Sequence, residues 1–448
     1  MHARRTRPDA GPLDRRRLAA AGLSALLPGL GQLFNRRGGL AALFLLPSLL
    51  LILGAGLLWM TQSPARLVAS IVAPDVLGTL LALNIVVLAW RLVAVGQAYM
   101  DTRWAGPTGR LGMGGLVMLA LLVALPHGLV QWYGSALGGA FSRVFETELR
   151  GSAGRPVPAP AQGQRINVLL LGVDRRAGHD ALLTDTMMVA SLDPIGRTVS
   201  ILSIPRDLVN VPLGDGNDFG PKVNSLMHYA DSHRDQFPAG GRVALRRAIG
   251  ALLDIEIPYY AQVSFAGFKR MVDAVGGVDI VVAAAINDPE YGTDGYRIGK
   301  GRHHLDGQAA LDYVRSRKGK GESDFTRAIR QQQVLLALRE AATSDGSLLW
   351  QLPDLLDAVA STVRTNMPTS VLPAFAAITD EVGDEGVVRA IIRHPLVRSE
   401  DTRYGSSLIP DLEAIRAVAA DLFPEPGGFP VPWPTPKPSA PADGSPTP

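Results

Sequence analysis

Aspartates stand beside two predicted strands of this chain, where they could share a divalent cation. Asp174 directly follows the apolar run Ile166–Val173, and Asp185 begins the run Asp185–Leu192. Two carboxylates at one edge of a sheet offer the hard oxygen ligands that Mg²⁺ takes, commonly together with substrate phosphates. Spacing alone leaves open the alternative that both aspartates are turn or cap residues.

Basic residues follow the next predicted strand and begin a predicted helix. Arg206 comes after the strand Thr198–Ile204, so its planar guanidinium, which matches phosphate oxygens, would reach the same sheet edge if the strands are neighbours. A structural ion pair with Asp207, or with another carboxylate, is the alternative. Lys222 opens a helix, where the backbone N-terminus also favours anions.

Arginine is densest between residues 315 and 331. Arg327, Arg330 and Gln331 are three and four residues apart, so they share one face of the helix predicted over Asp324–Ala341. The arginines of this region are Arg315, Arg317, Arg327 and Arg330. Their convergence in one cleft would need a countercharge, which a pyrophosphate would supply. The alternative is a solvated helix face with local ion pairs.

Other reaction chemistries are excluded by what the sequence lacks. It contains no GxxxxGK[ST], GxSxG or HExxH motif and no cysteine, which removes P-loop, serine-hydrolase, zincin and thiolate chemistry. We expect no nucleic-acid partner, because the arginines lack interleaved aromatic residues and lie beyond the predicted membrane spans.

The first third of the chain predicts a membrane anchor. The 448 residues are 47% hydrophobic and only 19% charged, against about a quarter charged in ordinary soluble domains. Uncharged runs near the length of about 20 residues that crosses a bilayer occur at Gly39–Met60, from about 76 to 90, and from 111 to about 130; the second could extend to 95 past Arg91. We therefore expect three transmembrane helices, with 18–34 lying at the interface.

The distribution of arginine predicts the orientation of these helices. We expect three groups of arginines to face the cytoplasm. They are the arginines of residues 4–17, the pair Arg36 and Arg37, and the loop that contains Arg91, Arg103 and Arg110. Everything after about residue 135 would then be extracytoplasmic, in a multi-pass protein of the cell membrane. A cleavable signal peptide fits less well, because two further spans follow the first.

Composition divides the chain into five segments. We predict a basic cytoplasmic N-terminus with an interfacial segment (1–38), a three-helix transmembrane region (39–135), a linker (136–164), an extracytoplasmic domain (165–422) and a Pro-rich disordered tail (423–448).

The domain over 165–422 reads as α/β, a mixed sheet flanked by helices. Predicted strands alternate with helical patterns, which favours a sheet covered on both faces. Further predicted strands are Tyr259–Phe265 and Val278–Val282, and further predicted helices are Lys222–Ser232, Arg242–Leu253, Phe268–Val275 and Leu305–Arg315.

Seven blocks in order give the sequence a family resemblance. The blocks are INVLLLGVDRR (166–176), TDTMMVASLD (184–193), SILSIPRD (200–207), KVNSLMHYA (222–230), VDAVGGVDI (272–280), LDGQAALDYVRSR (305–317) and SDFTRAIRQQQVL (323–335). On these the chain resembles the LytR–CpsA–Psr family of cell-wall glycopolymer ligases. Three spans exceed the single anchor common in that family.

The resemblance implies a phosphotransferase. Such enzymes move a glycopolymer from a polyprenyl pyrophosphate to a peptidoglycan hydroxyl as a phosphodiester. It implies that Asp174 and Asp185 hold Mg²⁺ (or Mn²⁺) and, with Arg175 and Arg206, form the catalytic set. The implied pyrophosphate-binding residues are Lys222, Arg315, Arg317, Arg327, Arg330 and Gln331.

Two other functions fit the same residues. One is a pyrophosphatase that uses water as the acceptor, and the other is a non-catalytic envelope lipid or glycan receptor that acts as a regulator. The receptor or regulator is disfavoured, because a regulator needs a cytoplasmic effector and the predicted cytoplasmic segments are only short and basic.

Overall fold

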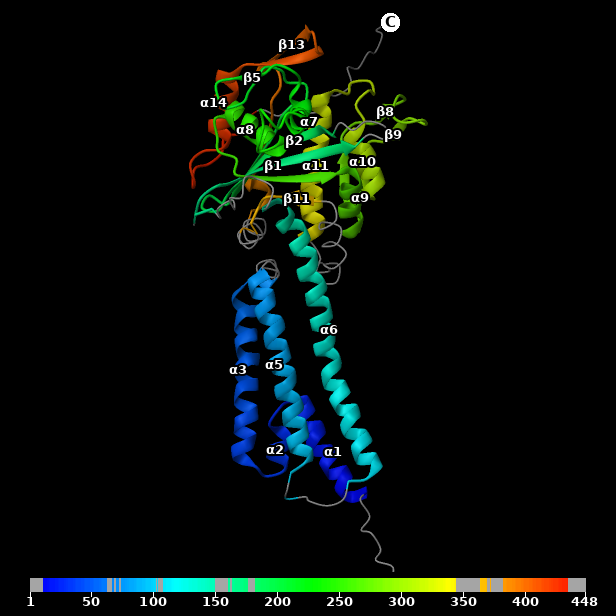
Figure 1. Cartoon of the computed structure of the whole chain (residues 1–448). Coiled ribbons are helices and arrows are strands. Elements are labelled where there is room, and N and C mark those ends of the chain that lie inside the picture. Colours follow the sequence, from blue (N-terminus) through cyan, green and yellow to red (C-terminus); the bar gives the residue numbers. More distant parts are fainter. Residues whose placement is uncertain are drawn as a thin grey trace, which may run out of the picture. The chain divides into compact units, whose positions relative to one another are not determined.

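The structure, a computed structural model, forms two compact units, Met1–Gly139 and Ala140–Pro448 (Figure 1). It describes residues 11–62, 67, 70–71, 74–101, 103, 108–149, 160–161, 163–175, 182–343, 363–368, 371 and 382–433. Each unit has hydrophobic clusters of its own.

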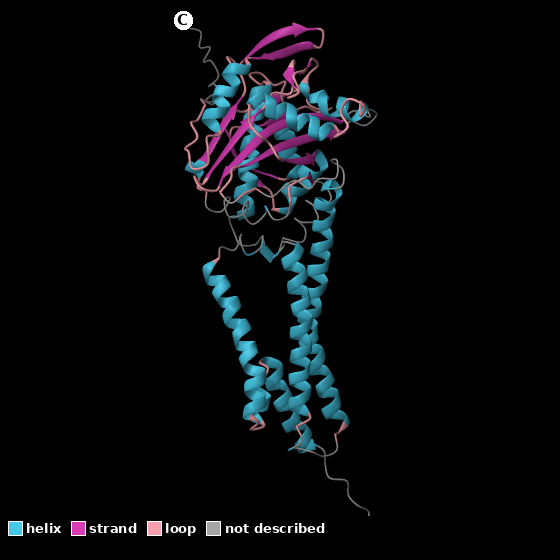
Figure 2. Ribbon diagram, turned by 60° about the vertical axis from the view of Figure 1, so that its left-hand side comes forward, coloured by secondary structure: helices cyan, strands magenta, loops and turns pink. Residues whose placement is uncertain are grey.

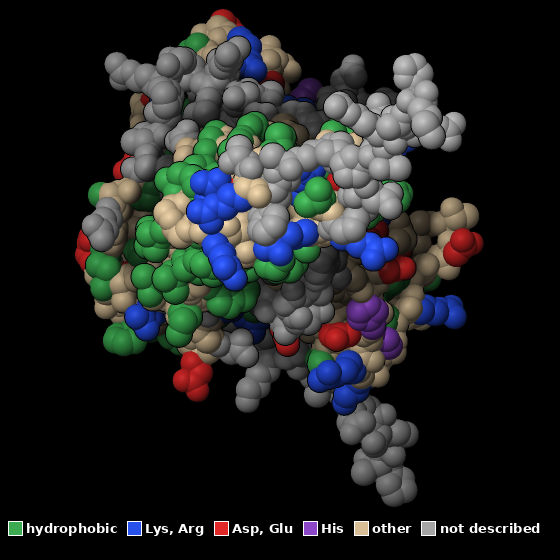
Figure 3. Space-filling model, turned by 90° about the horizontal axis from the view of Figure 1, so that it is seen from below, with side chains coloured by type: hydrophobic (Ala, Val, Ile, Leu, Met, Phe, Trp, Pro, Cys, Tyr) green, Lys and Arg blue, Asp and Glu red, His purple; other side chains and the backbone are tan. Residues whose placement is uncertain are grey.

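The first unit is helical. Its elements are α1 (Gly11–Leu26), α2 (Leu30–Phe34), α3 (Gly38–Thr61), α5 (Pro74–Tyr99) and α6 (Arg110–Leu149). Three stretches are long and apolar enough to cross a membrane, Gly38–Thr61, Val76–Tyr99 and Arg110–Gly139, which confirms the three predicted spans. Figure 3, seen from below, shows basic side chains gathered among hydrophobic ones.

Residues 18–34, which we predicted to lie at the membrane interface, pack against α5. Ala20 and Ala21 of α1 are fully buried, and α1 packs along α5. Gln32 Nε2 donates to the Ala94 carbonyl at 2.8 Å, and Asn35 Nδ2 donates to the Ala98 carbonyl at 2.8 Å. Helices α1 and α2 therefore form a short hairpin held against α5 by buried polar bonds.

The second unit is built on a six-stranded mixed sheet with the order β11-β6-β1-β2-β3-β12. The strands are β1 (Ile166–Arg175), β2 (Leu182–Asp193), β3 (Thr198–Ser203), β6 (Tyr259–Ser264), β11 (Val363–Thr365) and β12 (Val387–Ile391). Strand β1 runs antiparallel to β2 and parallel to β6, and β3 runs antiparallel to β2 and parallel to β12. This is the predicted mixed α/β sheet.

Helices and smaller hairpins surround this sheet (Figure 2). The helices are η2 (Val223–Ser225), α7 (Leu226–Ser232), α8 (Gly241–Leu253), α9 (Phe265–Ala274), α10 (Gly307–Arg315), α11 (Asp324–Thr343), η4 (Asp384–Gly386) and α14 (Leu412–Leu422). The two-stranded sheets pair β4 (Val211–Pro212) with β5 (Asp218–Phe219), β7 (Val278–Val282) with β10 (Gly301–Leu305), β8 (Ile286–Asp288) with β9 (Tyr296–Ile298), and β13 (Val397–Thr402) with β14 (Gly405–Pro410).

Both faces of the sheet are covered, because successive side chains of a strand point to opposite sides. Leu202 of β3 belongs to the largest core cluster together with Leu245 and Ile249 of α8. The next residue, Ser203, faces the other way and accepts a hydrogen bond from Gln332 of α11. Helix α8 therefore packs on one face and α11 on the other, as the alternating pattern predicted.

Three details differ from the sequence predictions. Strand β7 pairs with β10 rather than joining the main sheet. Helix α6 continues to Leu149, past the predicted start of the linker at 136. Residues 424–433, predicted to begin a disordered tail, are held on the domain because Trp433 packs on its core and the Val431 N–H donates to the Asp421 carbonyl. Residues 434–448 lie outside the described part.

Candidate functional site

A β-bulge places Asp185. In the register of β1 and β2, Gly172 pairs with Thr186 and Val173 pairs with Thr184, so Asp185 is the extra residue. A bulge redirects a side chain away from the regular alternation of a strand and is common beside active sites. A Cβ on Gly172 would lie 2.9 Å from the Thr186 Cβ, so glycine permits the close pairing that frames the bulge.

Arg206 joins this carboxylate to the loop after β3. Its Nη1 donates to Asp185 Oδ1 at 2.6 Å, and its Nε lies 3.7 Å from Asp207 Oδ2. Burial alone would lower the pKa of Arg206, but Asp185, Asp324 and Asp207 together raise it above its ordinary value. The guanidinium is therefore a firmly held cation among three carboxylates.

Lys222 extends the same network from the start of η2. Its Nζ lies 2.9 Å from Asp207 Oδ1. Backbone bonds hold this segment over the arginine loop, since the Asn224 N–H donates to the Arg206 carbonyl and the buried Thr184 hydroxyl donates to the Asn224 carbonyl. Lys222 is thus fixed beside Arg206 by the backbone as well as by its own charge.

Helix α11 contributes the opposite wall. Arg327 Nη2 lies 2.9 Å from Asp324 Oδ1, and the Arg327 side chain is only 9% exposed. Burial lowers the pKa of Arg327, which Asp324 raises in part and the neighbouring cation of Arg206 lowers further. A buried cation whose pKa is lowered in this way would be stabilised by an additional anion.

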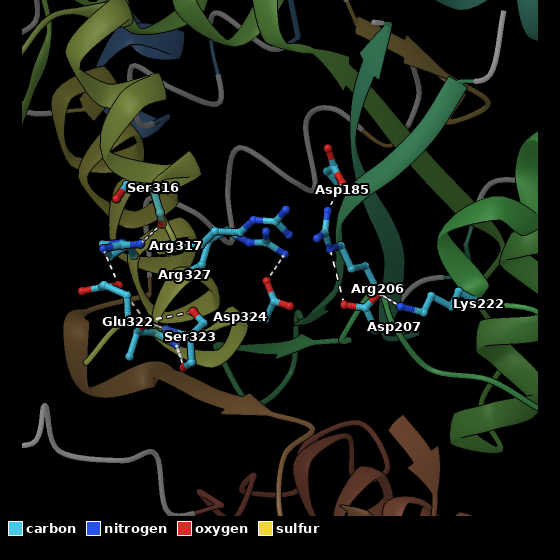
Figure 4. Close-up of polar contacts among 12 residues, drawn as sticks. Asp185, Arg206, Asp207, Lys222, Ser316, Arg317, Glu322, Ser323, Asp324 and Arg327 are labelled. Carbon is cyan, nitrogen blue, oxygen red and sulfur yellow. Dashed lines mark hydrogen bonds and ion pairs between the residues drawn. The ribbon is translucent and has the colours of Figure 1, made fainter. Parts of the chain in front are cut away.

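These side chains line one cleft between the ends of β2 and β3 and the first turns of α11 (Figure 4). Its walls include Asp185, Arg206, Asp324, Arg327 and Gln331. In Figure 4, Asp324 and Arg327 on one side face Asp185 and Arg206 on the other. The structure therefore brings together four of the predicted residues, Asp185, Arg206, Arg327 and Gln331, with Lys222 joined to them through Asp207.

Arg330 and Arg315 do not line this cleft. Arg330 forms an ion pair of 2.7 Å with Glu322 and donates to the Ser316 carbonyl. Arg315 lies over the ring of Phe265, 4.5 Å from its centroid.

Arg317 and two residues of β1 complete the predicted set. The Arg317 backbone N–H donates to Asp288 Oδ2 at 2.9 Å, and Arg317 is not among the cleft-lining residues. The backbones of Asp174 and Arg175 lie at the end of β1, where Asp174 pairs with Leu183. Their side chains lie outside the described part of the structure.

One buried polar residue beside this cleft, Gln332, was not among the predicted site residues. Gln332 is 1% exposed, and its amide donates to Ser203 Oγ at 2.8 Å and to the Ala390 carbonyl at 2.9 Å. It ties α11 to both β3 and β12. The only signal in the sequence was a glutamine on the apolar side of an amphipathic helix, next to Gln331.

The described carboxylates fit a hard divalent cation. Mg²⁺ takes one or two carboxylates and keeps several waters, and Asp185 and Asp324 offer oxygen ligands at the cleft. Asp324 Oδ1 is buried without a hydrogen bond, although it lies in the ion pair with Arg327. Within the described residues, no cluster of three or more metal-ligating side chains occurs. A metal site formed by Asp185 and Asp174 stays a prediction, because the side chain of Asp174 lies outside the described part of the structure.

The protein thus combines a helical membrane anchor with an α/β domain. Arginines and carboxylates line the cleft of that domain. The chain belongs to the LytR_cpsA_psr family, which residues 142–408 match.

Curated relatives and a solved structure each resemble part of the chain. It is 35% identical over 207 residues to the polyisoprenyl-teichoic acid–peptidoglycan teichoic acid transferase TagU of Bacillus cereus (strain AH820), covering 46% of this chain and 62% of the relative. The TagU of Oceanobacillus iheyensis is 34% identical over 203 residues, covering 45% and 59%. The chain thus spans about three fifths of these relatives. The crystal structure of B. subtilis TagV is 27% identical, with a TM-score of 0.47, covering 58% of this chain and 96% of TagV.

Proposed function

We propose that this chain is a membrane-anchored phosphotransferase that moves a glycopolymer from a polyprenyl pyrophosphate to a hydroxyl of peptidoglycan. The observation that carries the proposal is the cleft in which Arg206 and Arg327 face each other across Asp185 and Asp324. Family membership and the names of the TagU relatives support the same reaction.

The residues of the cleft suit phosphoryl transfer. Attack of a hydroxyl on phosphorus, with a phosphate as leaving group, needs positioning and charge neutralisation more than covalent chemistry. Arg206 and Arg327 would bind the pyrophosphate oxygens, and Gln331 would donate from its amide. Lys222 would stabilise the charge that develops on the departing polyprenyl phosphate. Mg²⁺ (or Mn²⁺) held by Asp185 and Asp174 would neutralise charge on the same oxygens.

The ion pairs of the cleft would change partners when substrate binds. Arg206 is held by Asp185 at 2.6 Å, and a pyrophosphate would compete with that carboxylate for the guanidinium. Asp185, once released by Arg206, would be available to hold the metal ion. The two events would support each other, because each one removes the charge that the other leaves unpaired.

We place this domain outside the cytoplasm. The first unit has three apolar spans, and Arg36, Arg37, Arg103 and Arg110 lie near the ends of spans on one side of the membrane by connectivity. The positive-inside rule assigns that side to the cytoplasm. A reporter fused after residue 433 that is active only inside the cell would refute this orientation.

Transfer is tested with the full chain in detergent, a lipid-linked glycopolymer and peptidoglycan fragments. Product joined to the glycan supports the transferase, whereas free phosphorylated polymer indicates a pyrophosphatase. The Arg327→Gln variant should lose the activity, and the Arg398→Gln variant, which changes an exposed arginine of β13, should keep it. Full activity of Arg327→Gln would contradict the assignment of the cleft.

A further inference from the structure

A buried carboxylate outside the cleft holds the loop between α10 and α11. Asp288 ends β8 and is 2% exposed. Its Oδ2 accepts hydrogen bonds from the Ser316 hydroxyl at 2.9 Å, from the Arg317 N–H at 2.9 Å and from the Lys318 N–H at 3.0 Å. One oxygen thus binds three successive residues, directly after α10 ends at Arg315.

Helix α11 holds the same turn from its other side. The Arg330 guanidinium donates to the Ser316 carbonyl, and its Nη1 pairs with Glu322 Oε2 at 2.7 Å. The carbonyl and the N–H of one planar peptide unit point in opposite directions. Arg330 therefore binds one polar group of the peptide between Ser316 and Arg317, and Asp288 binds the other. Buried charged side chains fix this peptide on both sides.

The β8–β9 hairpin lies against the loop beyond this peptide as well. A Cβ on the buried Gly319 would lie 2.7 Å from the Asn287 carbonyl oxygen. Lys318 Nζ also lies 2.6 Å from Glu290 Oε2, but these two side chains are 53% and 63% exposed. An ion pair so exposed contributes little to stability. The position of the loop therefore depends on Asp288 and on the close approach of Gly319.

The geometry of the carboxylate sets the direction of the chain. A buried carboxylate is costly unless hydrogen bonds stabilise its charge. Among the described residues, Oδ1 of Asp288 is enclosed without a hydrogen bond, so the three donors all meet Oδ2. Hydrogen bonds to a charged acceptor are about twice as strong as neutral ones. The path along which the chain leaves α10 is thereby fixed by one side chain.

Arg317 is the residue that this arrangement positions. In Figure 4 it lies on the same side of the cleft as Arg327. Arg317 is not among the residues that line the cleft, so its guanidinium must reach a bound phosphate from beside the walls. Ordering a long side chain on binding costs conformational entropy. A backbone that Asp288 already holds removes part of that cost, although Asp288 itself does not touch the ligand.

We propose that Asp288 is a positioning residue, which fixes the backbone of Arg317 so that the guanidinium can bind the phosphates of the substrate. The role rests on the proposed function of the cleft, and it brings the β8–β9 hairpin into substrate binding. It acts only through Arg317, which distinguishes it from a contribution to stability alone.

The test measures the binding of geranylgeranyl pyrophosphate to the full chain in detergent. Arg317→Gln should weaken binding about tenfold, as expected for a lost hydrogen bond to a charged group, and Asp288→Asn should weaken it severalfold. In the double variant, Asp288→Asn should add less than about twofold, because the effects of residues that act through each other are not additive. Glu290→Gln, which removes the exposed contact between the same hairpin and loop, should bind as the wild type does.

Two failures give different results. Losses that multiply in the double variant, or an affinity that neither single variant changes, would overturn the role of Asp288 while the wild type still binds the lipid. Absence of binding by the wild type would instead refute the pyrophosphate site, and this role with it.

A second measurement follows the loop itself and does not depend on a variant that folds. Hydrogen exchange in the wild type, resolved to single amides by mass spectrometry, should show protection of Arg317 and Lys318, because both amides bind a buried carboxylate. Asp288→Ala should exchange about tenfold faster at both amides, and Asp288→Asn, which retains an acceptor oxygen, should lie between. Glu290→Gln should match the wild type. Unprotected amides in the wild type would overturn the proposal.

Discussion

The amide of Gln332 on α11 donates a hydrogen bond of 2.8 Å to the hydroxyl of Ser203 on β3. Ser203 ends the strand that leads into Arg206, and Gln332 follows Gln331 on the helix that carries Arg327. One buried amide therefore couples the two walls of the cleft, and its second bond to the Ala390 carbonyl extends the coupling to β12.

Replacing Gln332 should destabilise the protein. Gln332→Leu would leave Ser203 Oγ and the Ala390 carbonyl buried without this donor, and an unsatisfied buried group costs about 1–3 kcal/mol. Thermal unfolding of the full chain measures the loss, with the exposed Gln308→Leu as the control. An unchanged midpoint for Gln332→Leu would show that the amide contributes nothing to the fold.

Removing a cleft arginine should weaken substrate binding. Hydrogen bonds to charged groups contribute about 1.5–3 kcal/mol, so Arg206→Gln should bind a polyprenyl pyrophosphate about tenfold or more weakly. Titration of the full chain with the lipid measures this, and Arg398→Gln serves as the control. Circular dichroism checks that Arg206→Gln remains folded. Equal affinity in the folded variant would move the phosphate away from Arg206.

The proposed metal dependence can be tested through Asp185. Chelation of divalent ions should reduce transfer by the wild type, and added Mg²⁺ should restore it, because the metal would neutralise pyrophosphate charge. Asp185→Asn should need a higher Mg²⁺ concentration, whereas Glu400→Gln, at an exposed position of β13, should behave as the wild type. Activity that survives complete chelation would remove the metal from the proposal.

The fully buried Asp193 should be essential for stability. It pairs with Arg165 at 2.9 Å, and its oxygens accept from the N–H groups of Ile195, Gly196 and Gly427. Asp193→Ala leaves the arginine buried without its partner, which costs about 3–5 kcal/mol. Thermal unfolding should show a smaller loss when Arg165→Met is combined with Asp193→Leu. An equal or larger loss in that double variant would contradict a penalty due to the unpaired charge.

The raised pKa of His304 should make the stability of the protein depend slightly on pH. Its hydrogen bond to Asp279, helped by the Gly276 carbonyl, raises the pKa of His304. A raised pKa in the folded state gives stabilisation that is complete below the unfolded value of about 6.5 and is lost as pH rises through the folded value. The thermal midpoint of the wild type should therefore exceed that of His304→Gln at pH 5.5 by more than at pH 8.5. A constant difference would exclude this titration.

Much of the fold follows from local pattern. The apolar run of β1 and the glycine pair after α9 marked their elements, because burial and chain reversal leave a signature within a few residues. Pairing between distant segments has no such signature. The sequence could not show that Val278–Val282 would pair with residues 301–305 rather than join the main sheet.

The site was predictable to the same extent. Residue type and helical spacing identified Arg327 and Gln331, and strand ends identified Asp185 and Arg206. The same helical spacing grouped Arg330 with Arg327, but Arg330 turns to Glu322 and Ser316. The partner of so long a side chain depends on the tertiary structure, which helical spacing does not reveal. Gln332 was missed because a buried amide is recognised only through the groups that it satisfies.

The carboxylate of Asp193 holds the two ends of the α/β domain together. Arg165, just before β1, and Gly427, just after α14, both bind the same oxygen of that side chain. Tension applied to residues 165 and 427 would therefore act first on the contacts of Asp193, at the end of β2 that lies farther from the bulge residue Asp185.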